Sequence, residues 1–344
     1  MASPKYSVLV TGGAGYIGSH CVRRLLDREY RVVVVDDFRT GNRWALPEGV
    51  PLVECDVGNE DLVRQAIRTH GVGSVLHFAA HTVVPESIVD PLKYYGNNAC
   101  STRSLIASCR QEGVNRFVFS STAAVYGAPS DATVSESTAP APINPYGCSK
   151  LVTEWMLRDV AQSSRLSLDA GLGGELFRPI ILRYFNVAGA REDGKLGQST
   201  PNATHLIKIA AQAACGARSS VSILGTDYDT PDGTCIRDYI HVEDLADAHL
   251  AALDHLERGG GGCTYNCGYG RGYSVREVLD TMRRVSGVQF AIREEGRRAG
   301  DPPALIADAS AIRRELGWKP TRDDLDLICT TAWRWEQQFL RRDH

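Results

Sequence analysis

The stretch Thr11–Gly18, which reads TGGAGYIG, decides the fold. It follows the short apolar run Ser7–Val10 and leads into the amphipathic run Ile17–Arg28, so its glycines lie between a predicted strand and a predicted helix. The first glycine allows a sharp turn, the second allows a ligand to approach the backbone, and the third allows the helix to pack close to the sheet. The free amides at the start of such a helix bind phosphate, so the stretch predicts a dinucleotide site. These three glycines are Gly12, Gly15 and Gly18.

Short β-branched runs alternate with amphipathic stretches through the first half of the chain, as in the helical run Asp61–Thr69. The runs that we predict to be strands are Ser7–Val10, Arg31–Val35, Leu52–Val53, Ser74–Phe78, Arg116–Phe119 and Ile180–Tyr184. Continuous apolar strands alternating with helices are typical of a parallel sheet that is covered on both faces. We therefore predict an α/β fold with a Rossmann-type, doubly wound parallel sheet.

The amino-acid composition changes after Asn186. The stretch Ala188–Asn202 is rich in glycine and polar residues and is predicted to be a loop. We expect a smaller, mixed α/β carboxyl-terminal unit. Its predicted elements are the helix His205–Cys215, the strands Val221–Leu224 and Cys235–Val242, the helix Glu243–Leu256 with an acidic start, and the helix Arg276–Val285 capped by Ser274. The stretch Ser163–Phe177 contains serine and glycine and is predicted to be an exposed loop.

Bulk composition excludes several classes of protein. The chain has 344 residues, a net charge of -3, 43% hydrophobic and 23% charged residues, and no basic block, so we expect no nucleic-acid partner. The first apolar run ends at a glycine after Val10, so we expect neither a signal peptide nor a membrane span. The ten cysteines are scattered without the spacing of a metal site, so we expect reduced thiols, no metal and a cytoplasmic location.

An acidic residue at the end of the second predicted strand indicates which dinucleotide is bound. Asp36 follows Gly18 by 18 residues and can accept hydrogen bonds from both ribose hydroxyls. A carboxylate repels a 2'-phosphate, so we expect NAD and not NADP. Asp56 could accept from the adenine amino group, and Asn97 lies on a later helix; for each, an ordinary polar surface residue is an equal alternative.

Tyr146 and Lys150 are four residues apart and share one face of a predicted helix. An ammonium group beside a phenol favours the phenolate, so Lys150 should lower the pKa of Tyr146 and make it a general base. Thr122 ends the predicted strand nearest to this pair, where its hydroxyl could relay a proton from a substrate alcohol to Tyr146. The alternatives are a solvated helix face and an ordinary residue at the end of a strand.

At this point the chain resembles the extended short-chain dehydrogenases/reductases, through the glycine turn, Asp36, the segment Ser120–Gly127 and the run Tyr146–Lys150. Further segments are similar to UDP-glucose (UDP-galactose) 4-epimerases. These segments are Arg183–Asn186, Thr204–Ile207 and Asp232–Val242, and the last of them, DGTCIRDYIHV, is the most specific. The resemblance extends from about Ser7 to Trp335.

The resemblance implies an NAD-binding domain formed by residues 1–186 with about 234–260, and a nucleotide-sugar-binding domain formed by 187–233 with about 261–344. It implies catalytic roles for Tyr146, Lys150 and Thr122. The residues expected to bind the cofactor are Gly12, Gly15, Tyr16, Ile17, Gly18, Asp36, Asp37, Asp56, Val57, Phe78, Ala79, Ala80, Asn97, Ser120, Tyr146, Lys150 and Tyr184. The residues expected to bind the substrate are Thr122, Tyr146, Phe185, Asn186, Arg191, His205, Leu206, Leu224, Arg237, Val275, Arg298, Asp301 and Leu305.

The implied activity is 4-epimerisation of a UDP-hexose through a transient 4-keto sugar, with tightly bound NAD and a homodimeric enzyme. Related dehydratases and decarboxylases carry an acid where this chain has Ala123 and Ala124, which argues against both. Leu305 stands where some epimerases have a larger tyrosine, so N-acetylated sugars could be admitted. Arg191 could pair with the carboxylate of UDP-glucuronate, although a solvated loop arginine is favoured. A non-catalytic NAD-binding regulator is the alternative from another class, and it would not need Tyr146, Lys150 and Thr122 together.

Overall fold

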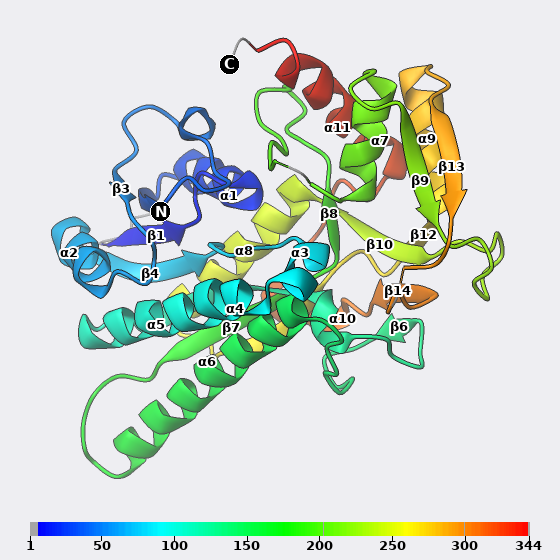
Figure 1. Ribbon diagram of the computed structural model, residues 1–344. Helices are drawn as coiled ribbons and strands as arrows, with labels where there is room; N and C mark the ends of the chain where they lie inside the picture. Colours follow the sequence, from blue (N-terminus) through cyan, green and yellow to red (C-terminus); the bar gives the residue numbers. More distant parts are fainter. Residues whose placement is uncertain (1–5, 202, 299, 343–344) are drawn as a thin grey trace.

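The computed structural model describes residues 6–201, 203–298 and 300–342. Seven strands form one sheet in the order β11-β7-β5-β4-β1-β2-β3, and each neighbouring pair is parallel (Figure 1). The strands are β1 (Ser7–Thr11), β2 (Arg31–Asp36), β3 (Leu52–Glu54), β4 (Val72–His77), β5 (Arg116–Thr122), β7 (Arg178–Tyr184) and β11 (Cys263–Cys267). This arrangement confirms the predicted Rossmann-type sheet.

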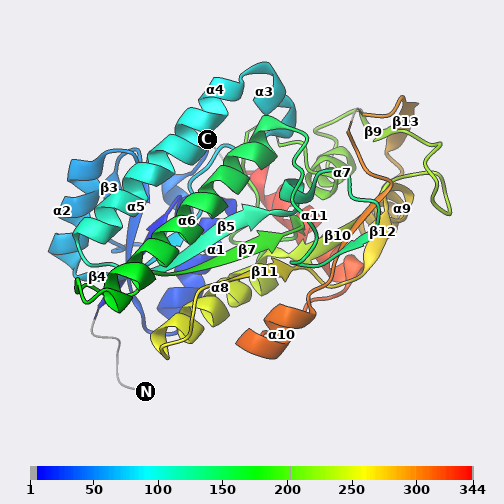
Figure 2. The same cartoon turned by 90° about the horizontal axis from the view of Figure 1, so that it is seen from below.

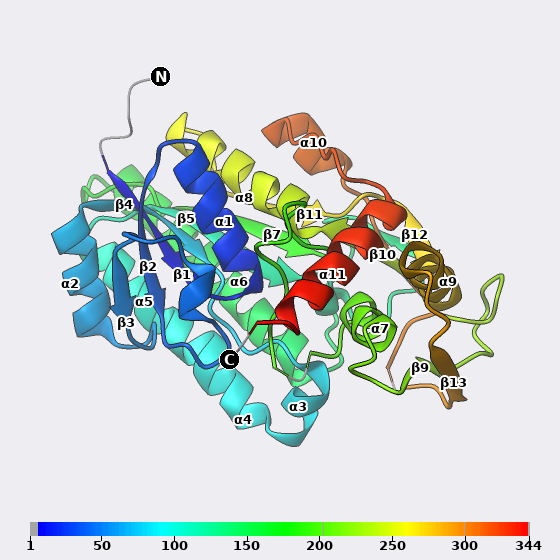
Figure 3. The ribbon, with the colours of Figure 1, turned by 90° about the horizontal axis from the view of Figure 1, so that it is seen from above.

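Helices cover both faces of this sheet. Figures 2 and 3 show α1 and α8 on one face and α2, α5 and α6 on the other. Alternation along β1 explains both layers, because Val8 and Val10 pack in one hydrophobic cluster and Leu9 packs in the other. The helices are α1 (Tyr16–Asp27), α2 (Glu60–His70), α5 (Ser101–Gln111), α6 (Pro145–Asp169) and α8 (Val242–Glu257). No helix in the described ranges is both long enough and apolar enough to cross a bilayer.

A smaller mixed sheet lies beyond the carboxyl ends of the large sheet, in the order β12-β10-β14-β6, with β8 also paired to β10. β12 runs antiparallel to β10, whereas β8 and β14 run parallel to it. The elements of this region are β6 (Thr133–Val134), β8 (Asn186–Ala188), β10 (Ile236–His241), β12 (Gly272–Ser274), β14 (Ala304–Ala307), the parallel pair β9 (Ser220–Leu224) and β13 (Ala291–Glu295), and the helices α7 (Leu206–Ala214), α9 (Val275–Ser286), α10 (Ser310–Leu316) and α11 (Leu325–Phe339).

Short helical segments complete the first half of the chain between β2 and β6. They are the 3-10 turns η1 (Arg43–Ala45) and η3 (Ala123–Tyr126), the helices α3 (Val84–Val89) and α4 (Pro91–Tyr94), and the π-helical turn η2 (Tyr95–Cys100).

Two strands pair differently from the predicted division of the chain. β11 lies within the range assigned to the substrate-binding part, yet it pairs with β7 and extends the large sheet. β10 lies within the range assigned to the NAD-binding part, yet it pairs with β8, β12 and β14. Periodicity identifies a strand but not its partner, because pairing depends on contacts that are distant in sequence.

The predicted loop Ser163–Phe177 is wrong over its first half, because α6 continues to Asp169 and projects beyond the sheet (Figure 1). Ser164 is buried, and its hydroxyl accepts a hydrogen bond of 3.0 Å from the backbone N–H of Phe177. Only the segment 170–177 is irregular, and it begins just before the glycine at position 171, which has a positive φ of 69°. Serine is tolerated within a helix, whereas a glycine with positive φ ends one.

Candidate active site

A cavity of about 890 Å³ opens at the carboxyl ends of β1, β2, β4, β5 and β7, between the two sheets. This is the edge of a doubly wound sheet at which ligands bind. Nearly all of the residues that we predicted from sequence line it, from the glycine turn at one end to Arg298 and Asp301 at the other. Its size is within the range of small-molecule sites.

The glycine turn has the geometry of a phosphate cradle. Gly12 has a φ of +69°, and a Cβ there would lie 2.6 Å from the backbone nitrogen of Ala79. A Cβ on Gly18 would lie 2.2 Å from the carbonyl oxygen of Gly12. Gly15 is the N-cap of α1 and supplies no side-chain hydrogen bond, so no side chain caps the amides of the first turn. A pyrophosphate fits this arrangement.

Asp36 ends β2 and is held in place by two backbone donors. Its Oδ2 accepts from the N–H of Ala14 at 2.8 Å, and its Oδ1 accepts from the N–H of Phe38 at 2.9 Å. Burial raises the pKa of Asp36, and these two bonds oppose that rise. The carboxylate therefore lines the cavity in a fixed orientation, as a ribose acceptor requires.

Arg39 lines the same end of the cavity, and the sequence analysis missed it. Its guanidinium donates to three predicted cofactor residues, with distances of 3.0 Å to Asp37, 2.8 Å to Asp56 and 2.9 Å to Asn97. Asp56 also accepts from the backbone of Gly58 at 2.6 Å, so its carboxylate is already held by protein donors. The three predicted residues thus form one network, and the sequence signal for it was an arginine just after an acidic pair.

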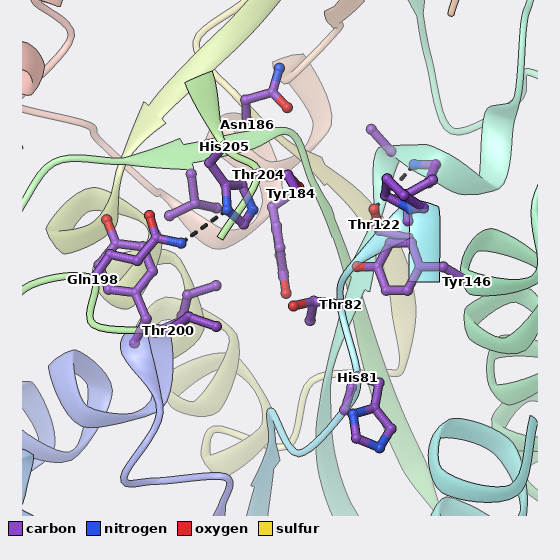
Figure 4. Close-up of a pocket in the computed structure, with 18 of the residues that line it drawn as sticks. His81, Thr82, Thr122, Tyr146, Tyr184, Asn186, Gln198, Thr200, Thr204 and His205 are labelled. Atoms are coloured by element: carbon purple, nitrogen blue, oxygen red, sulfur yellow. Dashed lines mark hydrogen bonds between the residues drawn. The ribbon is translucent and has the colours of Figure 1, made fainter. Parts of the chain in front are cut away.

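Thr122 and Tyr146 lie together in the cavity (Figure 4). Thr122 is the last residue of β5, and its hydroxyl accepts from the N–H of Ala124 at 3.1 Å. Tyr146 is in the first turn of α6, which Asn144 caps by accepting from Gly147 at 2.9 Å. A strand end and a capped helix start therefore fix the two hydroxyl groups relative to each other.

Burial is the main cause of the pKa shifts of Tyr146 and Lys150. Burial raises the pKa of Tyr146, and a hydrogen bond with Thr122 partly opposes that rise. Lys150 is itself buried, which lowers its own pKa to about 7. The expected lowering of the Tyr146 pKa by Lys150 is thus not found in this structure. Removal from water destabilises both the phenolate of Tyr146 and the ammonium of Lys150. Lys150 Nζ donates to the carbonyl of Ser120 at 2.9 Å and lies 4.9 Å from the centre of the Phe119 ring.

Ser120 and Lys150 are not among the residues that line the cavity, although both were predicted to contact the cofactor. Ser120 is fully buried, and its hydroxyl bonds to Nε2 of His249 at 2.8 Å. Tyr184, which also hydrogen-bonds to Ser120, does line the cavity. Ser120 therefore lies behind the cavity wall, and its hydroxyl is hydrogen-bonded to other protein side chains.

The opposite end of the cavity carries two arginines around one acid. Asp301 accepts from Arg298 at 2.9 and 2.8 Å and lies 3.6 Å from Arg237. Two guanidinium groups share one carboxylate, so the cluster keeps a net positive charge facing the cavity. Planar guanidinium donors suit the oxygens of a diphosphate. The other predicted substrate residues that line the cavity are Phe185, Asn186, His205, Leu206, Leu224, Val275 and Leu305.

Arg191 is the exception among the predicted substrate residues, because it does not line the cavity. Its guanidinium pairs with Asp193 at 3.2 Å and lies near His20 and Arg23 of α1. The backbone turns here, with the N–H of Gly194 donating to the carbonyl of Arg191 at 2.9 Å, and position in the sequence alone does not reveal on which side of such a turn a side chain lies.

Further residues that line the cavity carried no recognisable sequence pattern. They come from the segment after β4, the approach to α6 and the segment before α7, and include His81, Thr82, Ile143, Asn144, Gln198 and Thr200. Such residues lie on irregular segments, where periodicity gives no guide to direction.

A parallel sheet of this order, with a glycine turn on its first strand and a Tyr-Lys helix beside it, defines the extended short-chain dehydrogenases/reductases. Residues 8–268 match the model of the NAD dependent epimerase/dehydratase family. A UDP-glucose 4-epimerase of Azospirillum brasilense is 54% identical over 338 residues, which is 98% of this chain and 93% of that protein.

Two solved structures are also close. One is a UDP-glucose 4-epimerase from Brucella ovis in complex with NAD, with a TM-score of 0.90, 42% identity, and coverage of 96% of this chain and 98% of that one. The other is a UDP-Glc/GlcNAc 4-epimerase from Campylobacter jejuni, with a TM-score of 0.83, 47% identity, and coverage of 97% and 99%. The chain therefore belongs to the NAD dependent epimerase/dehydratase family and, within it, to the UDP-glucose 4-epimerases.

Proposed function

We propose that this chain catalyses the NAD-dependent interconversion of UDP-glucose and UDP-galactose by inversion at C4 of the hexose. The observation that carries the proposal is the presence of two sites in one cavity. Thr122 and Tyr146 form a proton-transfer pair, and Arg237 and Arg298 form a site for a diphosphate. The relatives at 54% and 42% identity, both UDP-glucose 4-epimerases, support the same activity.

The residues present fit NAD, since the glycine turn leaves room for a pyrophosphate and Asp36 stands at the ribose position. Bound there, NAD would supply the acceptor for the hydride from C4 of the sugar and the donor that returns it to the opposite face. Tyr146, hydrogen-bonded to Thr122, takes the proton from the 4-hydroxyl as its phenolate while a 4-ketone forms, and it returns that proton after inversion. The positive charge of a bound nicotinamide ring would favour this phenolate against the effect of burial. The reaction is balanced, because the proton and hydride that leave the sugar both return.

Turning the keto sugar over requires that the hexose be held less firmly than the nucleotide. The charged donors Arg237 and Arg298 lie on β10 and on the segment between β13 and β14, whereas Thr122 and Tyr146 lie on β5 and α6. Binding energy placed on the diphosphate keeps the intermediate in the cavity while leaving the sugar ring free to rotate.

The residues after Thr122 argue against elimination of water. Ala123 and Ala124 begin the 3-10 turn that follows β5, and both line the cavity. Neither side chain can donate or accept a proton, so these positions offer no acid for removal of a hydroxyl at a neighbouring carbon. Inversion at C4 needs no such acid.

Substitution of Tyr146 by phenylalanine tests this function. Tyr146→Phe should lower the kcat for UDP-galactose by about 10³-fold, since it removes the proton-transferring hydroxyl. The NAD content, measured by absorbance after denaturation, should stay at the wild-type level. Tyr273→Phe is a matched control, because that hydroxyl lies outside the cavity. Full activity of Tyr146→Phe would contradict the assignment, and a wild-type protein that converts no UDP-sugar would be a regulator.

A second candidate activity is 4-epimerisation of UDP-N-acetylglucosamine. Leu305 lines the cavity, and the Campylobacter jejuni relative at 47% identity is a UDP-Glc/GlcNAc 4-epimerase. A leucine leaves more room than a tyrosine for a substituent at C2. Leu305→Tyr should therefore abolish turnover of the N-acetylated sugar and retain turnover of UDP-glucose. An equal loss on both sugars would show that Leu305 does not set this specificity.

Cellular location and assembly belong to the same proposal. We expect a homodimer, which light scattering of the purified protein tests. We also expect a cytoplasmic location. NAD should remain bound through purification. The position of Arg191 outside the cavity gives no support to UDP-glucuronate as the substrate.

A further inference from the structure

Gln198 and His205 lie on the segment between β8 and α7 and line the cavity side by side (Figure 4). His205 is the N-cap residue of α7, but its imidazole makes no capping hydrogen bond. The ring is therefore not used to cap the helix, and it lines the cavity. Gln198 is buried, with 6% of its surface exposed, whereas nothing in the sequence pattern marked it as functional.

The amide of Gln198 determines where His205 carries its proton. Nε2 of Gln198 lies 2.9 Å from Nδ1 of His205. An amide NH₂ group only donates, so Nδ1 must accept, and the proton of the neutral ring then resides on Nε2. Enclosure within the cavity wall lowers the pKa of His205, which keeps the ring neutral near pH 7. Nε2, on the side of the ring away from Gln198, is thus an N–H donor.

A buried ion pair fixes the backbone of Gln198. Its carbonyl oxygen accepts from Nζ of Lys208 at 2.7 Å and from Nε1 of Trp335 at 3.0 Å. Lys208, on α7, also pairs with Glu336 of α11, and both side chains are at least 95% buried. Two donors on one carbonyl hold residue 198 in place and thereby fix the direction of its amide.

The packing of the segment against α11 adds to this restraint. A Cβ on Gly197 would lie 2.4 Å from the ring of Trp335, so the chain before Gln198 runs directly against that indole. Contacts with α7 and α11 therefore hold Gln198 in place.

We propose that Gln198 is a positioning residue that sets the tautomer of His205, so that Nε2–H donates to an acceptor oxygen of the UDP moiety. The inference rests on the proposed function, because it names how that substrate is held. The carbonyl oxygens of uracil and the oxygens of the diphosphate only accept hydrogen bonds, so a neutral Nε2–H matches them and a ring with its proton on Nδ1 does not.

Histidine-selective ¹⁵N NMR of the NAD-loaded wild-type protein is the first test. The spectrum of His205→Asn identifies the resonances of His205. The result expected is a protonated Nε2 and an unprotonated Nδ1. The reverse tautomer would overturn the proposal, even if UDP binds and the enzyme is active. The tautomer is measured on the wild-type protein, and His205→Asn serves only to assign the resonances.

A double-mutant cycle is the second test. Gln198→Met removes the amide at similar volume and should raise the Kd for UDP and the KM for UDP-glucose about tenfold, with kcat changed less than twofold. In a His205→Ala background, Gln198→Met should cause no further loss, because its partner is gone. An equal loss in both backgrounds would overturn the proposal.

Gln338→Glu is the matched control. Gln338 lies on α11 against Gly194 of the same segment but does not line the cavity, so its substitution should leave the Kd for UDP unchanged. A tenfold effect of Gln338→Glu would show that the segment responds to any change at α11, and it would overturn a specific role for Gln198. A wild-type protein that binds no UDP would instead contradict the proposed function.

Discussion

The two ends of the cavity are built in different ways. The cofactor end uses backbone groups of a single turn, together with Asp36 at the end of the neighbouring strand. The substrate end uses side chains from segments far apart in the chain, such as Asn186, Arg237 and Arg298. A site made by local backbone geometry leaves a fixed spacing of glycines in the sequence, whereas a site made by distant side chains leaves no such pattern.

This difference explains why the cofactor end tolerates so little change. The backbone amides bind the pyrophosphate only if it approaches the glycine turn closely. An added side-chain atom in this turn therefore displaces the ligand. The substrate end depends on charge and hydrogen bonds, each of which can be removed singly. We therefore expect the largest single-site effects at the glycine turn, and graded effects among the arginines.

Gly18→Ala should cause the largest loss of NAD affinity at the cofactor end. The added Cβ would lie 2.2 Å from the carbonyl oxygen of Gly12, so the first turn of α1 must shift away from the pyrophosphate. Loss of two charge-assisted hydrogen bonds corresponds to about 4 kcal/mol, or roughly a 1,000-fold weaker affinity for NAD. NAD content after purification and titration of NAD-free protein measure this effect. Gly261→Ala is the control, because no atom lies within 4 Å of its Cβ position.

Sequence reasoning succeeded where chemistry is local and failed where it is not. The glycine turn and the cap of α9 by Ser274 are local patterns, and the structure contains both as expected. The pairing of β11 with β7 depends on contacts more than 80 residues apart, and no periodicity encodes it. The roles of Arg39 and Gln198 depend on side-chain direction in irregular segments, which only the folded chain determines.

Buried histidines and a buried aspartate should respond to acid with opposite signs. Burial lowers the pKa of His77, on β4, to about 3 and that of His249, on α8, to about 4. Between pH 6.5 and 4 the unfolded chain binds these protons and the folded chain does not, so each histidine costs about 3 kcal/mol of stability on acidification. Asp238, on β10, has its pKa raised by burial to about 6. Its contribution is complete below pH 3.8 and is lost as the pH rises through 6.

Urea unfolding between pH 4 and 7 measures these contributions separately. Asp238→Asn removes the group that gains stability in acid, so its loss of stability from pH 6 to 4 should exceed that of the wild type by about 2 kcal/mol. His77→Gln should reduce the loss by a similar amount, although it also disturbs hydrogen bonds to Thr11 and Thr102. Parallel curves for all three proteins would contradict the assigned pKa shifts.

The smallest of these effects tests the substrate end alone. Arg298→Met keeps the aliphatic stem and removes the guanidinium that Asp301 orients. Loss of one charged donor corresponds to about 2 kcal/mol, so the KM for UDP-glucose should rise roughly 30-fold. Because Arg298 lies at the end of the cavity away from the glycine turn, NAD content should be unchanged.

The neighbouring Arg297 makes this experiment specific. Arg297 is also ion-paired, to Asp227, but it does not line the cavity. Arg297→Met removes an equal charge one residue away, and an exposed pair of this kind contributes little. If both variants raised the KM equally, the effect would be one of net charge, and the substrate end would not be built from individually placed side chains. A rise confined to Arg298→Met, with NAD retained, would establish that the two ends of the cavity bind their ligands independently.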